Sequence, residues 1–242
     1  MATARFIGPG RAGGSLSVAL ARVGWDIAWP SGRGDDVTDA AAGVDLLVIA
    51  TPDGAIASLA RAVRPDPHTV VTHLSGALGL DALDPHPRRA ALHPLAALPD
   101  PVTGADRLRS GITFAVAGDP LVRHVVGQLG GRAVEVPDEL RPLYHATAVM
   151  ASNHLVALSG QVADLAAHLD VPVEVYWQMM AATLDDVAAR GPAAALTGPA
   201  ARGDLETIRR HLDALPAAHV DAYRALSERA AALAAAPAGM PA

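Results

Sequence analysis

One stripe of polar residues on a predicted helix carries side chains that could move a proton. In the helical pattern that begins near Arg141, His145, Ser152 and Asn153 are spaced i, i+7 and i+8, so a helix would place an imidazole, a hydroxyl and an amide on one face. Histidine titrates close to neutral pH, which suits it to protonate the oxygen of a carbonyl group that is being reduced. We predict His145 as the proton donor, with Ser152 and Asn153 orienting the carbonyl. The alternative is a helix-buried histidine whose hydrogen bonds are satisfied internally.

A glycine-rich turn near the N-terminus predicts where the reductant binds. Three glycines with the spacing G-x-G-x-x-G lie between a short apolar run and a helical pattern that begins at Leu16. In a strand, turn and helix of this kind, free backbone N–H groups and the helix dipole can hold a pyrophosphate. The predicted dinucleotide contacts are Gly8, Gly10, Arg11, Ala12 and Gly13.

The residues after the second predicted strand bear on the type of dinucleotide. Ser31 and Arg33 follow the strand 26–29, and no carboxylate stands at its end. An acidic residue there would bind the ribose 2′-hydroxyl of NAD, whereas arginine can bind a 2′-phosphate. We predict NADP(H), although Asp35 and Asp36 follow closely. The alternative is a solvated, charged turn.

Further polar residues follow the next two predicted strands and should lie at the same edge of the sheet. Thr51 and Pro52 follow the strand 45–50 and are predicted beside the nicotinamide half of the cofactor. Asp53 either lies near them as a functional group or caps the next helix. We predict that Ser75 contacts the cofactor and that His73 contacts the substrate. Both could instead be turn residues.

Two predicted loops offer additional substrate contacts. Residues 84–101 contain five prolines and are predicted as a loop, and His93 lies within it. A loop of this length is more often functional than idle, and its closure would bring His93 to the substrate. Arg202, in the segment 198–204, could clamp a substrate carboxylate. The alternatives are a rigid turn at His93 and a helix cap formed by Asp204.

These residues need a scaffold, and the chain predicts one in two parts. Short apolar runs alternate with helical patterns up to about residue 137, which predicts an α/β fold, Rossmann-like, with a mostly parallel sheet and helices on both faces. Only helical patterns follow, which predicts an all-helical second domain. The predicted strands are 4–8, 26–29, 45–50, 69–74, 112–117 and 133–136, with helices at 13–23, 54–63 and 120–129. The expected domains are 1–138 for the dinucleotide, 139–233 for substrate and dimerisation, and 234–242 as a disordered tail.

Composition narrows the class of protein. The chain of 242 residues carries a net charge of −6 without a basic cluster, which argues against nucleic acid as a partner. It has no cysteine, and the 19 basic residues are all arginine, so neither a thiolate nucleophile nor a lysine Schiff base is available. No histidine spacing suggests a metal site, so we expect none. No apolar run reaches the ~18 residues of a membrane span, and the first strand leaves no room for a signal peptide. We expect a cytoplasmic homodimer that acts on a small molecule.

Several motifs carry a resemblance to a known family. They are Gly8–Gly13, His73–Gly76, His93–Leu95, Tyr144-His145 with Ser152-Asn153, and Leu196–Asp204. On these motifs the chain resembles bacterial two-domain proteins with a Rossmann-like domain followed by a helical domain of unknown function. More distantly it is similar to the 6-phosphogluconate dehydrogenase superfamily, which includes ketopantoate reductase and pyrroline-carboxylate reductase. The resemblance implies an NADP-linked reductase with its active site between the domains.

One departure from that superfamily bears on mechanism. Its dehydrogenases for hydroxy acids generally carry a catalytic lysine on the first long helix of the second domain, and this chain has no lysine. Our leading hypothesis is therefore an NADPH-dependent reductase of a small 2-oxo acid, ketopantoate first, with His145 in place of the lysine. A second hypothesis is reduction of a cyclic imine, for which no general acid is strictly needed. A third is a nucleotide-binding sensor or scaffold without catalysis.

Overall fold

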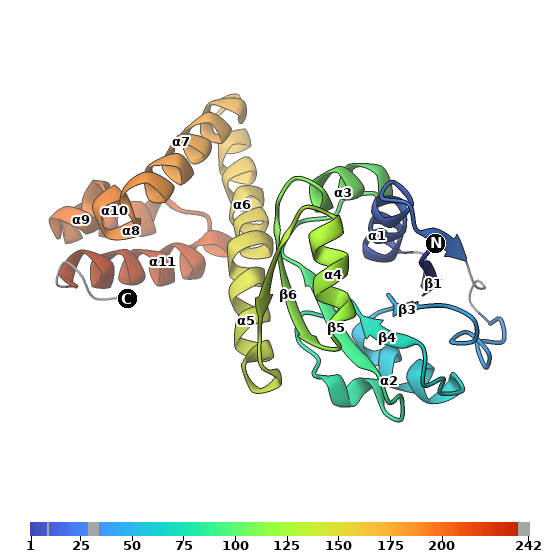
Figure 1. Ribbon diagram of the computed structural model, residues 1–242. Coiled ribbons are helices and arrows are strands. Elements are labelled where there is room, and N and C mark those ends of the chain that lie inside the picture. The colour runs from blue at the N-terminus through green and yellow to red at the C-terminus, as the bar shows by residue number, and fades with distance from the viewer. Residues whose placement is uncertain (9, 29–33, 237–242) are drawn as a thin grey trace. The chain divides into compact units, whose positions relative to one another are not determined.

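The computed structural model describes residues 1–8, 10–28 and 34–236 (Figure 1). The chain divides into two compact units, Met1–His154 and Leu155–Ala242. The predicted boundary at residue 138 falls before this division. The difference is the helix α5 (Arg141–Val149), whose side chains bond to strand β5 and to the loop after β4 in the first unit.

The first unit is built on one seven-stranded sheet with the order β2-β1-β3-β4-β5-β6-β7. All neighbouring strands are parallel except β5 and β6, which are antiparallel. The predicted Rossmann-like fold class and each of the six predicted strands are confirmed. The strands are β1 (Thr3–Ile7), β2 (Asp26–Ala28), β3 (Leu46–Ile49), β4 (Val70–His73), β5 (Arg89–Pro94), β6 (Thr113–Gly118) and β7 (Arg132–Glu135).

Alternation along the strands sends side chains to two cores, one on each face of the sheet. Phe6, Val48 and Leu92 pack with α1 (Arg11–Ala21), α3 (Pro101–Leu108) and α4 (Leu121–Gln128). Ile7 and Ile49, one residue out of phase, pack with α2 (Asp53–Ala62). Because strand side chains alternate between faces, these neighbouring residues serve opposite cores. The predicted three-layer arrangement follows from this pattern (Figure 1).

The proline-rich segment 84–101 is a correction to the sequence analysis, because it is not one loop. Its centre forms β5, in which Ala90, Ala91 and Leu92 are fully buried. Pro94 is the last residue of that strand, and Pro101 opens α3, where the missing N–H is harmless. The prolines therefore mark the ends of elements. His93 accordingly lies on a strand of the sheet.

The topology brings several strand ends to one edge. β1 lies between β2 and β3, so the strand order reverses next to β1. Ligands of open α/β sheets bind at such a switch point, outside the carboxyl ends of the strands. β1, β3, β4 and β5 are mutually parallel, so their carboxyl ends share this edge.

Among its described residues, the second unit consists of helices joined by short connections (Figure 1). Its helices are α6 (Leu155–His168), α7 (Glu174–Arg190), α8 (Pro192–Ala195), α9 (Gly198–Arg202), α10 (Leu205–Ala214) and α11 (Ala217–Ala235). The tail predicted for 234–242 begins too early, since α11 continues to Ala235 through a run of alanines. Residues 237–242 lie outside the described part. No helix in that part is both long enough and apolar enough to cross a membrane.

Candidate functional site

The glycine turn after β1 has three distinct steric environments. Gly8 has φ +97°, and a Cβ there would lie 2.8 Å from Thr51 Cγ2. A Cβ on Gly13 would lie 2.5 Å from the carbonyl oxygen of Gly8. Gly10 differs, because a Cβ there would meet no described atom within 4 Å. Gly8 and Gly13 are thus required by the turn and by helix packing, whereas Gly10 leaves an approach to the backbone open, as a diphosphate requires.

The start of α1 fits an anionic group. Gly10 is the N-cap residue, makes no side-chain cap and is exposed, and the first helical turn contains no acidic residue. Free N–H groups and the positive end of the helix dipole therefore face an open space. Arg11 is exposed and Ala12 half-buried beside it. The predicted contacts Ser31 and Arg33 lie outside the described residues.

Thr51, Pro52 and Asp53 form the next section of the edge, between β3 and α2. Thr51 contacts the glycine turn through its methyl group, as the position of Gly8 requires. Its Oγ1 is buried and has no hydrogen-bond partner among the described residues. Pro52 is the exposed N-cap residue of α2, and Asp53 is the first residue of that helix. An unpaired hydroxyl beside the turn is a feature that a ligand could satisfy.

The loop after β4 is held by its own polar side chains. Ser75 Oγ donates to Asp53 Oδ2 at 2.7 Å and accepts from the amides of Ala77 and Leu78 at 3.1 Å each. His73 is fully buried, and its Nε2 lies 3.2 Å from the carbonyl oxygen of Gly79. Burial lowers the pKa of His73, so the ring is neutral. The structure therefore does not place His73 where it could contact a substrate, because no part of its side chain reaches the surface.

An imidazole–phenol pair follows at the end of β5. His93 Nδ1 lies 2.8 Å from the hydroxyl of Tyr144 on α5, with the two rings edge to face. The ring of His145 lies 5.7 Å from that of His93. Both imidazoles border the space that a side chain on residue 76 would enter, since a Cβ there would lie 2.9 Å from His93 Nε2 and from His145 Cδ2. Gly76 therefore makes room for both rings.

Charge in this cluster is set by Arg141, the first residue of α5. Its side chain is fully buried, and its Nη2 donates to the carbonyl oxygen of Ser75 at 3.2 Å. Nε has no partner among the described residues. Burial lowers the pKa of Arg141, and Asp138 and Tyr144 oppose that shift. A buried guanidinium bonded to neutral carbonyls favours negative charge developing nearby.

The titration of the pair follows from burial and this cation. Burial lowers the pKa of His93 to about 4, with His145 and then Arg141 adding to the effect. Burial raises the pKa of Tyr144, and Arg141 opposes that shift. At neutral pH both members of the pair are therefore uncharged. An uncharged imidazole can still donate its N–H to a developing oxyanion.

The predicted polar stripe on one helix needs correction. α5 ends at Val149, and the π-helix η3 (Met150–His154) follows before α6. The i→i+5 turn is wider than an α-helical turn, so the α-helical spacing assumed for the stripe does not hold through Ser152 and Asn153. Ser152 is half-buried and Asn153 is exposed, and neither side chain makes a hydrogen bond within the described part of the chain.

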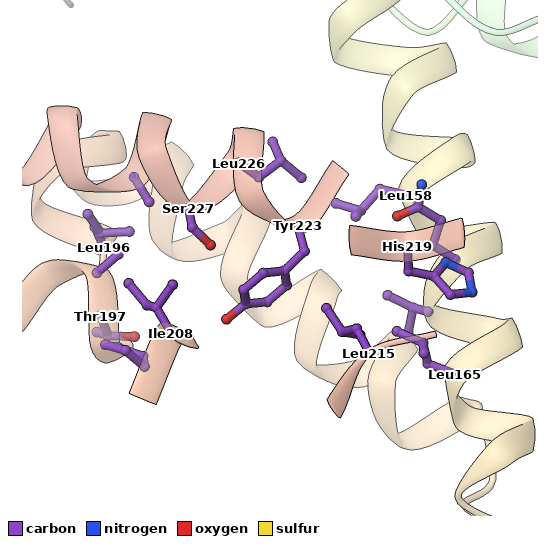
Figure 2. Close-up of a pocket in the computed structure, with 15 residues that line it drawn as sticks. Leu158, Leu165, Leu196, Thr197, Ile208, Leu215, His219, Tyr223, Leu226 and Ser227 are labelled. Carbon is purple, nitrogen blue, oxygen red and sulfur yellow. The ribbon is translucent and has the colours of Figure 1, made fainter. Parts of the chain in front are cut away.

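Arg202 belongs to the second unit, where it is the exposed last residue of α9. The cap predicted for Asp204 is confirmed, because its carboxylate accepts from the amide of Thr207 at 3.0 Å. Residues of the same segment line a cavity of about 330 Å³ in this unit, shown in Figure 2. Its wall is mostly aliphatic, and Tyr223 is one of its few polar residues. Arg202 is not part of that wall.

Comparison with known proteins agrees with the two-part architecture. Residues 28–99 match the family model of a Rossmann-like domain, and residues 111–230 match that of a domain of unknown function, DUF2520. The chain therefore combines a Rossmann-like domain with a C-terminal DUF2520 domain. No curated protein matches the sequence.

Solved structures share the fold at low sequence identity. A Bacteroides fragilis protein, provisionally described as an NADP oxidoreductase, has a TM-score of 0.78 at 20% identity, covering 96% of this chain and 98% of that one. A Thermotoga maritima protein has a TM-score of 0.71 at 21% identity, with the same coverage of 96% and 98%. Pyrroline carboxylate reductase from Plasmodium falciparum, with NADP bound, has a TM-score of 0.63 at 13% identity, covering 97% and 98%.

Three residues of the site were missed as functional candidates. In the sequence, Tyr144 and Gly76 stand out only as parts of motifs, and Arg141 marks only the start of a helix. Arg141 carried a usable signal of a functional role. It stands among apolar helix residues, directly before Pro142, and no acidic residue follows it within one helical turn to pair with its charge. The contact between residues 93 and 144 had no sequence signal, because it joins segments far apart in the chain.

Proposed function

We propose that this protein is an NADP(H)-dependent reductase of a small 2-oxo acid. One observation carries the proposal: a single sheet edge holds both uncovered backbone at Gly10 and the imidazole–phenol pair of His93 and Tyr144. Intervening residues join the two, through the contact of Gly8 with Thr51 and the bond between Asp53 and Ser75. A dinucleotide laid along this edge would bring its nicotinamide toward the cluster.

The proposed cofactor is supported by the groups that the glycine turn and its neighbours offer to a dinucleotide. Gly10 offers uncovered backbone, α1 offers free N–H groups, and the Thr51 hydroxyl has no described partner. The solved relatives include proteins described with NADP, which supports a nicotinamide dinucleotide. The preference for the 2′-phosphate is supported by Ser31 and Arg33 in the sequence alone.

The reaction half rests on the imidazoles at Gly76. A bound reduced nicotinamide supplies hydride to the substrate carbonyl carbon. The chain must then supply a proton to the carbonyl oxygen, and His93 and His145 are the two candidates beside Gly76. Arg141 favours negative charge nearby, which suits an anionic substrate. We also propose that Asn153 orients the substrate as an amide donor.

A cyclic imine is the second candidate substrate. Two observations favour it: the chain has no lysine to act as a general acid, and the similar structures include pyrroline carboxylate reductases. A protonated imine already holds the positive charge that hydride neutralises. Its reduction would therefore make no demand on the neutral His93.

Oxidation of NADPH, followed at 340 nm against panels of 2-oxo acids and cyclic imines, tests the proposal. We expect turnover with at least one 2-oxo acid and a lower rate for His145→Ala and for His93→Gln. Turnover of imines alone would replace the 2-oxo acid with the second candidate. Tight NADPH binding without turnover on either panel would favour a sensor or scaffold instead.

We also propose that the protein is a homodimer formed through its helical unit. Among the described residues of that unit, Ala166 is the sole buried hydrophobic side chain. Large apolar side chains are exposed there, including Leu205 at 72% and Val156 at 70%. A helical unit this poorly buried gains stability by covering its apolar faces. Sedimentation equilibrium should give twice the chain mass of 24.7 kDa, and a monomer at micromolar concentration would contradict the proposal.

A further inference from the structure

We infer that His93 is the catalytic proton donor, acting through Nε2, and that Tyr144 is a positioning residue that supplies the proton behind it. This inference rests on the proposed reductase function and names the donor within it. It differs from the prediction made from the sequence, which chose His145. Three independent features of the cluster carry it.

The first feature is the tautomer that the contact with Tyr144 imposes. The hydroxyl of Tyr144 is 2.8 Å from His93 Nδ1 and has no other hydrogen-bond partner among the described residues. If Nδ1 carried the proton, the phenolic hydrogen would have no acceptor among the described residues. Donation from Tyr144 to Nδ1 satisfies both groups and leaves the imidazole proton on Nε2.

The second feature is the access to Nε2. This atom makes no hydrogen bond within the described residues. It is nevertheless accessible to solvent, whereas the unpaired Nδ1 of His73 is buried. His93 Nε2 lies 2.9 Å from the position that a Cβ of residue 76 would occupy. Glycine at residue 76 therefore leaves the donating edge of the ring uncovered. A substrate oxygen can reach the proton there.

The third feature is the cation behind the pair. Arg141 is fully buried beneath the loop that carries Ser75 and Gly76, and it lowers the pKa of Tyr144 against the effect of burial. A tyrosinate formed at Tyr144 would therefore be stabilised by a charge that cannot be lost at any working pH. Arg141 is accordingly a second positioning residue.

These features define one balanced proton transfer. As the substrate oxygen becomes negative, the Nε2–H bond of His93 breaks and an O–H bond forms on the product. The O–H bond of Tyr144 breaks and an Nδ1–H bond forms, so the imidazole changes tautomer and stays neutral throughout. The cycle closes by the reverse relay: solvent protonates Nε2 while the Nδ1–H bond breaks and its proton returns to the tyrosinate oxygen, which restores the starting tautomer. The relay needs no imidazolium, consistent with a His93 pKa of about 4.

The relay makes a specific prediction for pH dependence. The groups facing His93 are Tyr144, His145 and Arg141 on α5, Asp53 at the start of α2 and His73 on β4. With a neutral donor, kcat stays level between about pH 5.5 and about 8.5, whereas an imidazolium donor near its usual pKa would lose about tenfold per pH unit above about 6.5.

The test combines a spectroscopic and a kinetic measurement. In the full-length protein labelled with ¹⁵N-histidine, NMR should show His93 protonated on Nε2, and Tyr144→Phe should allow the other tautomer. With the 2-oxo acid found in the panel, Tyr144→Phe should lower kcat by about 10²-fold and leave KM within about twofold.

A matched pair elsewhere in the chain provides the control. His211 Nδ1 lies 2.6 Å from the hydroxyl of Tyr223, with rings 5.7 Å apart, on helices of the second unit. Tyr223→Phe removes the same group from a similar pair and should leave kcat within about twofold. Wild-type inactivity would count against the proposed function. Wild-type turnover with an unimpaired Tyr144→Phe, or a His93 proton on Nδ1, would overturn the relay alone.

Discussion

The hydroxyl of Ser75 donates a hydrogen bond of 2.7 Å to the Asp53 carboxylate, which joins the loop after β4 to the first turn of α2. The same oxygen accepts from the amides of Ala77 and Leu78. Ser75 therefore ties the start of α2 to the loop that holds Gly76. Its side chain serves the architecture of the site, whereas the sequence predicted a direct contact with the cofactor.

Replacing Ser75 by alanine tests this connection. The variant leaves two loop amides without their acceptor, so we expect the free energy of unfolding to fall by about 1 to 3 kcal/mol. Urea denaturation measures the change. Ser58→Ala is a suitable comparison, because Ser58 is exposed and bonds only to a carbonyl within its own helix. Equal stability of the two variants would show that Ser75 does not hold the loop.

The glycine turn allows cofactor binding to be separated from folding. Gly10→Ala adds a methyl group in open space at a backbone with φ −69°, so we expect unchanged or slightly higher thermal stability. The methyl group would stand where the diphosphate approaches, and NADPH binding should weaken by about tenfold or more. Gly8→Ala should instead destabilise the fold, because φ is +97° and Thr51 is in the way. Calorimetric titration and thermal melts of both variants distinguish these effects.

The buried hydroxyl of Thr51 leads to a third prediction. Thr51→Val keeps the shape of the side chain and removes an oxygen that has no described partner, so stability should be equal or higher. If that oxygen serves the cofactor, the variant should bind NADPH about 3-fold to 10-fold more weakly. Unchanged affinity in calorimetry would remove Thr51 from the cofactor site.

Acid should weaken the fold through His93. Its pKa is about 4 when folded and about 6.5 when unfolded, so only the unfolded chain takes up a proton between these values. The stabilisation is complete above pH 6.5 and is lost as the pH falls toward 4. The advantage of the wild type over His93→Gln should shrink by on the order of 2 kcal/mol between pH 7 and about 4.5. His124→Gln, at an exposed histidine on α4, should show no such convergence in denaturant titrations.

The fold was predictable because its signals are local. Short apolar runs marked six strands, and an unbroken series of helical patterns marked the second unit. β5 was missed because prolines at its ends outweighed the short buried run of Ala90, Ala91 and Leu92. Proline is excluded from the centre of a sheet ladder, yet it is tolerated at the end of a strand.

The site was predictable only where a single segment carries it. The spacing of Gly8, Gly10 and Gly13 indicated the turn, and His93 and His145 were both identified as polar groups of interest. Their common neighbour Gly76, and the pairing of His93 with Tyr144, arise from β4, β5 and α5 meeting in space. The π-helix at Met150–His154 likewise had no periodic signal, and it interrupts the α-helical spacing assumed for Ser152 and Asn153.

Calorimetric titration of the wild-type protein with NADPH and with NADP⁺ tests the central claim most directly. We predict saturable binding at one site per chain, lost or strongly weakened in Gly10→Ala while that variant melts at the wild-type temperature. The absence of measurable affinity for both nucleotides would contradict the account, because the open turn at Gly10 would then hold no diphosphate.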